Sequence, residues 1–335
     1  MQGFDGWRRA STVSPGYDGT ATMTLRRRVM ACIAASAAAL AWLMHHEGLW
    51  IDPLAAGNLP YYLAGTLALG LGIGLRDAST TAQRVIRDAA EYFALFTLIG
   101  LLGAVASYPE AAASRGFVDP ALARIDALLG FDWIALYRLV AAHPVLQVAG
   151  RVAYETIYYT PVAILGAFAI DGRRDRAWTM MAIFWVAAVL TLVAFWFMPA
   201  IGPLGYLWHG SIPYMPLSAR WQERLFPVLR DHAMRRVDLG GLQGLVSAPS
   251  FHTAAALLYI ACAWPMPRLR WPVLGVNVAM LLSTPVEGTH YLADMLTGGL
   301  VAATAWWTVA RLTAPRAATR SLPFRLTTSY DAPAG

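Results

Sequence analysis

The chain has 335 residues and a net charge of +6, and 57% of its residues are hydrophobic against 14% charged. Soluble globular proteins are about 45–50% hydrophobic and about 25% charged, so these few charges cannot cover a water-facing surface. The composition excludes a soluble protein and predicts an all-α, polytopic membrane helix bundle. All 26 basic residues are Arg. Because membrane proteins concentrate Arg in cytoplasmic loops, we expect membrane lipids and no nucleic acid as partners.

Eight apolar stretches are predicted to cross the membrane as helices. They cover residues 29–47, 59–75, 89–107, 145–170, 177–198, 250–264, 271–287 and 290–312. Several contain only about 15–17 residues, at or below the usual lower limit for a spanning helix. No internal repeat relates them.

Arginine placement orients these helices. Every second connection is basic, through Arg26–Arg28, Arg76, Arg84, Arg87, Arg173, Arg174, Arg176, Arg268, Arg270, Arg311, Arg316, Arg320 and Arg325. Because positive residues gather on the cytoplasmic side, both termini are predicted to be cytoplasmic, with two long external segments at 108–144 and 199–249. Basic residues that are all Arg, together with short spans, favour a bacterial inner membrane.

The remaining segments are polar or amphipathic. Residues 1–25 and 313–335 are predicted to be disordered tails. The sequence does not decide whether translation starts at Met1 or at Met23. No cleavage site follows the first span, which therefore predicts an anchor. Apolar residues at helical spacing in 121–140 predict a pair of interfacial helices, and 220–236 is basic and amphipathic. The two cysteines, Cys32 and Cys262, lie in apolar runs, so we expect neither a disulfide nor a metal site.

Two short motifs contain candidate catalytic residues. Ser247–Thr253 includes His252 and precedes the sixth span, and Glu287–Asp294 includes His290 and precedes the eighth. The arginine pattern places both motifs on the external side, each at a helix N-terminus. Such N-termini present unpaired N–H groups and a positive dipole end, which predicts a cradle for an anion such as phosphate.

The residue types predict roles within this cradle. Ser250 and the amides of Phe251 and His252 are candidate donors to substrate. His290 and Asp294 are four positions apart and so share one helical face; the carboxylate can orient an imidazole that attacks phosphorus. His252 can then protonate the departing alkoxide.

Each feature alone has a simpler interpretation. A lone His at a membrane interface is commonly just an interfacial side chain, and an isolated His–Asp pair can merely stabilise a helix. The conjunction of both motifs on one side favours catalysis, because intramembrane Asp and His are costly and usually functional. For Glu287 two roles remain open: it can tune the site, or it can only cap the helix.

The motifs resemble a known superfamily. Pro-Ser-x-His at 249–252, followed by Ser-x6-His-x3-Asp from Ser283 to Asp294, resembles the phosphatidic acid phosphatase type 2 superfamily over roughly residues 120–312. Pro-Ser-Phe-His-Thr at 249–253, Gly-Thr-His-Tyr-x2-Asp at 288–294 and Asn277 upstream of Ser283-Thr284-Pro285 resemble its inositol phosphorylceramide synthase branch more closely.

The resemblance implies a fold and a mechanism. It implies a six-helix catalytic core, assigned to residues 111–312 after N-terminal transmembrane helices at 26–110. It also implies a phosphohistidine on His290, with His252 as general acid and Asp294 as the orienting carboxylate, and with neither cofactor nor metal.

Two cationic phosphate clamps of the superfamily are missing. Its Lys-x6-Arg-Pro motif cannot exist in a chain without Lys, and Thr284 stands where phosphatases have Arg. Arg151, Arg235 and Arg236 are candidates to bind phosphate instead, although for each one taken alone contact with solvent or lipid headgroups is the simpler interpretation.

We therefore expect a lipid phosphotransferase or phosphatase that takes a phospholipid donor at the external leaflet. A lipid alcohol as acceptor makes it a headgroup transferase, as the synthase branch implies, and water as acceptor makes it a phosphatase. A transporter of an anionic lipid or solute is the rival from another class, and a non-catalytic lipid-binding scaffold is a further one. The sequence leaves the oligomeric state open.

Overall fold

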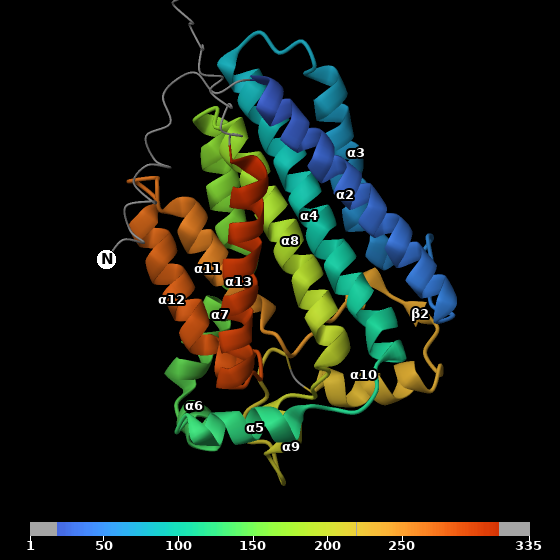
Figure 1. The fold of residues 1–335 in the computed structure, drawn as a ribbon, viewed down its shortest axis with the longest axis vertical. Coiled ribbons are helices and arrows are strands. Elements are labelled where there is room, and N and C mark those ends of the chain that lie inside the picture. Colours follow the sequence, from blue (N-terminus) through green and yellow to red (C-terminus); the bar gives the residue numbers. More distant parts are fainter. Residues whose placement is uncertain (1–18, 219, 315–335) are drawn as a thin grey trace, which may run out of the picture.

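A computed structural model describes residues 19–218 and 220–314 (Figure 1). These residues form twelve α-helices, two 3-10 turns and two short strands, so the all-α prediction is confirmed. The helices are α2 (Gly19–His46), α3 (Leu59–Gly74), α4 (Thr81–Ala113), α5 (Asp119–Leu128), α6 (Trp133–Ala141), α7 (Pro144–Ile170), α8 (Arg174–Phe197), α9 (Pro203–Tyr206), α10 (Trp221–Arg230), α11 (Phe251–Ala263), α12 (Arg270–Glu287) and α13 (Leu292–Thr313). Strands β1 (Trp50–Ile51) and β2 (Arg236–Val237) pair in parallel.

Each predicted span coincides with a helix: α2, α3, α4, α7, α8, α11, α12 and α13. Three of the described helices are long and apolar enough to cross a membrane, over Thr22–His46, Thr81–Ala113 and Arg174–Phe197, while α11 is apolar but has only 13 residues. The structure therefore supports a membrane protein. The count of eight spans stays a prediction from the apolar stretches and the arginine pattern.

Helix α2 begins inside the segment predicted to be a disordered tail. That prediction is wrong for residues 19–25, because α2 starts at Gly19. An ion pair at 2.5 Å between Arg26 and Glu91 of α4, together with the Arg26 guanidinium over the Trp178 ring, fixes this end of α2 to the bundle. The rest of that predicted tail, with Met1, and residues 315–335 lie outside the described residues.

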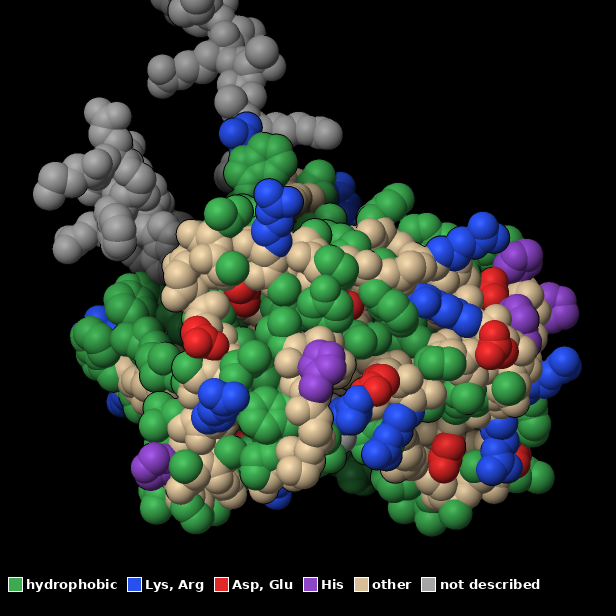
Figure 2. All heavy atoms as spheres, turned by 90° about the horizontal axis from the view of Figure 1, so that it is seen from below, with side chains coloured by type: hydrophobic (Ala, Val, Ile, Leu, Met, Phe, Trp, Pro, Cys, Tyr) green, Lys and Arg blue, Asp and Glu red, His purple; other side chains and the backbone are tan. Residues whose placement is uncertain are grey.

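The long helices lie side by side, and α5, α6, α9 and α10 lie across one end of the bundle (Figure 1). We call these four the end helices. Helices α5 and α6 fall in the stretch predicted for an interfacial pair. The chain alternates in direction, so the arginine-rich connections gather at the other end, where Arg174 binds the buried Asp88 at 2.7 Å. Figure 2 looks onto the end helices and shows hydrophobic, basic, acidic and His side chains interspersed there.

The main core lies between α4, α7, α8, α11, α12 and α13. Its largest fully buried side chains include Phe168, Trp178 and Tyr259, and Phe184 of α8 packs against Phe251 of α11 with ring centroids 5.4 Å apart. Because protein interiors are close-packed, this core fixes α11 and α13 relative to one another. The start of each of these two helices carries one histidine motif.

Candidate active site

The N-terminus of α11 lies directly against α13. The Ser250 N–H donates a hydrogen bond to the Asp294 carbonyl oxygen at 2.9 Å. Gly298 lies so close that a Cβ atom at this position would overlap the Ser250 carbonyl oxygen. These contacts hold together the two segments that carry His252 and His290.

Helix α11 keeps free donors at its N-terminus. Ser250 is the N-cap, and its buried hydroxyl accepts a hydrogen bond from the Thr253 N–H at 3.4 Å. The backbone N–H groups of Phe251 and His252 have no hydrogen-bond partner among the described residues. Unpaired amides at a helix N-terminus attract anions, so this end of α11 can bind a phosphate group, whereas the Phe251 ring belongs to the core.

The start of α13 differs from the sequence prediction. The helix begins at Leu292, so His290 lies in the preceding turn. The first two amides of α13 donate to the Asp126 carboxylate at 2.9 and 2.8 Å, and the Tyr291 amide donates to Asp294 at 3.0 Å. The expectation that α13 offers a second free N-terminus to an anion is therefore wrong, because two carboxylates already accept its hydrogen bonds.

His290 and Asp294 form a buried pair. His290 Nδ1 lies 3.1 Å from Asp294 Oδ1, and the two side chains are 3% and 0% exposed. The contact is that of an ion pair, and neither atom has a hydrogen-bond partner in the described part of the chain. The pair forms although His290 is not helical, because Asp294 is the third residue of α13 and reaches back over the start of its helix.

His252 faces His290 from α11. The two imidazole centroids are 6.4 Å apart, with 54° between the ring planes. His252 stacks on Tyr154 of α7 at 3.9 Å, and its Nδ1 lies 3.2 Å from the Tyr154 hydroxyl. Its Nε2 is buried without a hydrogen-bond partner among the described residues. Three helices thus bring two histidines, an acid and a tyrosine to one place.

A tight turn before α13 makes this arrangement possible. A Cβ atom on Gly288 would overlap the His290 ring and lie 2.8 Å from the Thr284 carbonyl oxygen and 2.9 Å from the Tyr154 hydroxyl. Thr289 has a φ of 50°, which is unusual for a β-branched residue. The turn, rather than helical spacing, positions His290.

Helix α5 holds this turn from the outside through two buried carboxylates. Besides Asp126, Asp119 accepts hydrogen bonds from the Ile201 and Gly202 amides at 3.0 and 2.9 Å and from the Tyr291 hydroxyl at 3.1 Å. Burial raises the pKa of both carboxyl groups, and the N–H donors oppose that rise. The end helices are therefore part of the support of His290.

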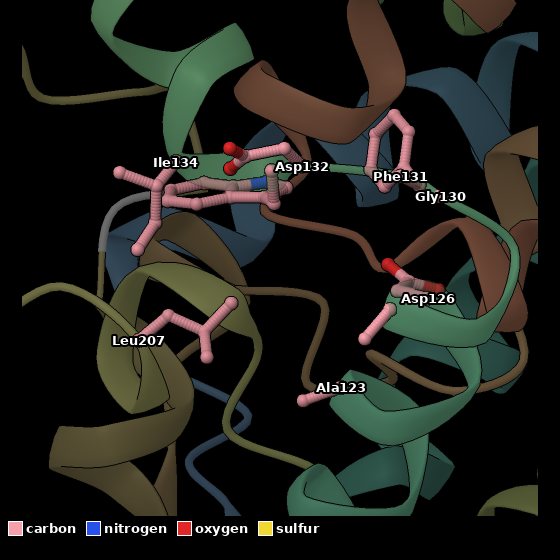
Figure 3. A pocket seen from close by; sticks show the side chains of 9 residues that line it. Ala123, Asp126, Gly130, Phe131, Asp132, Ile134 and Leu207 are labelled. Carbon is pink, nitrogen blue, oxygen red and sulfur yellow. The ribbon is translucent and has the colours of Figure 1, made fainter.

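A pocket of about 360 Å³ lies beside Asp126, between α5, α6 and the residue that follows α9 (Figure 3). Its lining consists of Ala123, Asp126, Ala127, Gly130, Phe131, Asp132, Trp133, Ile134 and Leu207. Neither His252 nor His290 lines it. The pocket neighbours the candidate site through Asp126 and is not the candidate site itself.

Arg151 is linked to the histidine motif through two side chains. Its Nε donates to the Tyr214 hydroxyl at 2.9 Å, and that hydroxyl donates to Glu287 Oε1 at 2.5 Å. Burial, and then the Glu287 hydrogen bond, raise the pKa of Tyr214 to about 12, so the hydroxyl stays protonated. Glu287 ends α12, and Arg151 precedes Tyr154 by one turn on the same face of α7.

Arg235 and Arg236 lie elsewhere. The Arg235 carbonyl accepts a hydrogen bond from the Trp50 N–H at 2.8 Å, and Arg236 Nη1 lies 3.8 Å from Asp52 Oδ2. Both interactions belong to the β1–β2 pair, on the opposite side of α8 from α11 and α13 (Figure 1). The structure does not bring these two candidates to the histidines.

Four residues that support the site were not predicted from the sequence: Tyr154, Asp119, Asp126 and Tyr214. Acids in the otherwise apolar stretch around α5 were a usable signal, since buried carboxylates need partners. Nothing in the sequence distinguished Tyr154 or Tyr214 from other interfacial tyrosines. Among the described residues, no group of three or more His, Cys, Asp and Glu side chains is placed to hold a metal ion.

A model of the PAP2 superfamily matches residues 120–308, which include both histidine motifs. The chain belongs to the PAP2 superfamily. Its members are typically phosphatases or phosphotransferases, which supports an enzyme that acts on phosphate esters. Neither a curated protein nor a solved structure gave a significant match.

Proposed function

We propose that this protein is a membrane lipid phosphotransferase that works through a phosphohistidine and transfers a phospholipid headgroup to a lipid alcohol, as an inositol phosphorylceramide synthase does. One observation carries the proposal: the imidazole centroid of His290, whose Nδ1 contacts the buried Asp294, lies 6.4 Å from the imidazole centroid of His252. The free amides of α11 add donors for the phosphate oxygens.

In the first step, His290 is the nucleophile. Its Nδ1 is held by Asp294, so the lone pair of Nε2 attacks phosphorus, and Asp294 stabilises the positive charge that develops on the ring. The bond between phosphorus and the lipid-alcohol oxygen breaks. His252 gives its Nε2 proton to that oxygen, and a neutral lipid alcohol leaves.

In the second step, the acceptor takes the phosphoryl group from His290. His252 removes the proton of the acceptor hydroxyl, whose oxygen forms a new bond to phosphorus while the phosphorus–nitrogen bond breaks. A lipid alcohol gives a new headgroup lipid, and water gives a phosphatase reaction by the same residues. Phosphoryl transfer depends mainly on positioning and charge stabilisation, so exclusion of water would decide between these outcomes.

The shortage of cations supports the transferase over the phosphatase. Thr284, which stands where phosphatases have Arg, is buried and donates its hydroxyl to the Met280 carbonyl oxygen at 2.7 Å. Arg151 is the candidate clamp that contacts the network next to His290. A site with few cations suits a singly charged phosphodiester better than a doubly charged monoester.

The membrane orientation is part of the proposal. With the arginine-rich connections in the cytoplasm, both termini are cytoplasmic, and the end helices and both histidines face the periplasm or lumen. The donor and the acceptor then both come from the external leaflet of what we propose is a bacterial inner membrane.

Product analysis by mass spectrometry tests the function. Membranes containing the protein are incubated with labelled phosphatidylinositol or phosphatidic acid, with and without ceramide and diacylglycerol. Headgroup transfer is expected in wild type and should disappear in His290→Ala, while Asp294→Asn should lower turnover by about 10²–10⁴-fold. His209→Ala, at an exposed histidine at the same end of the bundle, is the control.

Other outcomes separate the alternatives. Release of the phosphorylated headgroup or free phosphate without transfer would identify a hydrolase. Lipid flux that survives His290→Ala would identify a transporter, and turnover that survives this substitution would refute the phosphohistidine.

A further inference from the structure

His252 is held by a residue outside the two histidine motifs. Tyr154 of α7 stacks on the His252 ring with centroids 3.9 Å apart and 16° between planes, and its hydroxyl lies 3.2 Å from His252 Nδ1. The two residues are 98 positions apart. Stacking alone requires only an aromatic ring at position 154, so the hydroxyl contact is an additional feature.

The hydroxyl contact determines which nitrogen of His252 can react. With Nδ1 beside Tyr154, the nitrogen left for a substrate is Nε2, which is buried and has no hydrogen-bond partner among the described residues. His290 is arranged in the same way, because its Nδ1 faces Asp294. Both imidazoles are thus anchored through Nδ1, and both leave Nε2 for chemistry.

We propose that Tyr154 is the positioning residue of the general acid, an inference that rests on the proposed function. When His252 carries a proton on each nitrogen, Nδ1–H donates to the Tyr154 oxygen and Nε2–H points to the leaving group. Transfer of the Nε2 proton to the departing alkoxide leaves a neutral imidazole that still donates through Nδ1–H. The tyrosine keeps its own proton throughout and fixes the ring in the tautomer that can take a proton back from the acceptor.

The difference between the two anchors fits the two roles. Asp294 carries a negative charge that stabilises a positive His290 ring, as a nucleophile bonded to phosphorus requires. A neutral hydroxyl stabilises a charged ring less than a carboxylate does. His252 therefore releases its proton more readily than a histidine paired with a carboxylate would, as suits a general acid.

Tyr154→Phe separates this role from stacking, because phenylalanine keeps the ring and removes the hydroxyl. The assay measures the rate of the first step, the release of the leaving group in a single turnover, because both substrates share the second step, in which His252 acts as a base. It compares two leaving groups. One substrate is phosphatidylinositol or phosphatidic acid, whichever the wild type turns over, and the other is its analogue with p-nitrophenol in place of the lipid alcohol. A lipid alkoxide needs a proton as it departs, whereas p-nitrophenolate leaves readily without one.

Tyr154→Phe should slow release of the lipid alcohol in this first step roughly tenfold, the effect of losing one neutral hydrogen bond. It should slow release of p-nitrophenolate in the first step less than about twofold, which also shows that the variant is folded. His252→Ala should show the same selectivity with a larger loss, about 10²–10⁴-fold on the lipid. Tyr158→Phe, one turn further on α7 at a 72% exposed side chain, should change neither rate.

An equal loss on both substrates would mean that Tyr154 supports only the fold and would overturn the inference. Unchanged turnover of the lipid by Tyr154→Phe would overturn it as well. A wild-type protein that turns over neither substrate would instead refute the proposed function, and the inference would fall with it.

Discussion

Replacing Gly298 by Ala tests whether the contact between α11 and α13 holds the two histidines in place. Helix α13 has two adjacent glycines. A Cβ atom at position 298 would overlap the Ser250 carbonyl oxygen and lie 3.2 Å from both the Ser250 carbonyl carbon and Thr253 Cβ. A Cβ atom at Gly299 would lie 3.6 Å from Leu257 Cδ1, an ordinary contact. Gly299→Ala is therefore the matched control.

The two substitutions should change stability in opposite directions. Each substitution stabilises helix α13 by about 1 kcal/mol, because alanine has a higher helix propensity than glycine. Overpacking costs about 1–3 kcal/mol, and the upper end applies at position 298 because the obstacle is backbone, which cannot rotate away. We expect Gly298→Ala to be destabilised by about 2 kcal/mol and Gly299→Ala to be stabilised by up to about 1 kcal/mol.

Catalysis should respond more strongly than stability. Relief of the overlap at position 298 moves α11 away from α13, and a misplacement of about 1 Å can cost about 10²-fold in rate. Thermal unfolding in detergent, followed by the fluorescence of the 13 Trp residues, measures stability, and headgroup transfer measures turnover. If Gly298→Ala matches Gly299→Ala in both assays, the contact does not position the histidines.

Four further results are expected. Gly288→Ala should abolish turnover, because its Cβ would overlap the His290 ring; retained activity would contradict the tight turn. Tyr214→Phe should lower stability by about 1–3 kcal/mol in thermal unfolding, because it leaves Glu287 Oε1 buried without its donor. Burial raises the pKa of Asp126 above 3.8, so the folded protein keeps this proton at a higher pH than the unfolded chain and loses stability as the pH rises. Asp126→Asn removes that dependence, so the Tm of the variant relative to wild type should rise as the pH increases above about 4. Turnover should be unchanged in EDTA, since every proposed step uses only His290, His252 and Asp294.

The long helices were predictable because their determinants are local. Apolar length and arginine position depend on neighbouring residues and on the bilayer, and each predicted span is a helix. The stretch predicted at 145–170 illustrates this, since α7 runs from Pro144 to Ile170. Proline is favoured in the first turn of a helix, and Gly172 with φ 66° follows the end of α7.

The start of α13 was not predictable because a distant part of the chain decides it. A helix N-terminus read from sequence alone offers free amides to a ligand. Here Asp126, 166 positions before Leu292, accepts the hydrogen bond first. Local sequence rules contain no information about which distant carboxylate arrives there.

The same limit explains the arginine candidates. Arg235 and Arg236 end the basic segment 220–236 of a predicted external loop, which made them reasonable partners for phosphate. Their position is set instead by the pairing of β2 with β1, through Trp50. A two-residue strand pair between segments this distant leaves no periodic pattern in the sequence.

These tertiary contacts bear on the kind of phosphate that the site can hold. Asp126 accepts hydrogen bonds from the first two amides of α13, and Asp294 accepts one from the Tyr291 amide. The Phe251 and His252 amides of α11 have no partner among the described residues and can offset charge on a substrate. A phosphate monoester bound at His290 would bring two negative charges next to the buried Asp294 carboxylate, whereas a phosphodiester brings one, and repulsion at short range in a desolvated site is strong. This difference favours the proposed diester donor over a monoester, and Arg151 is the arginine candidate that is linked to the His290 segment, through Tyr214 and Glu287.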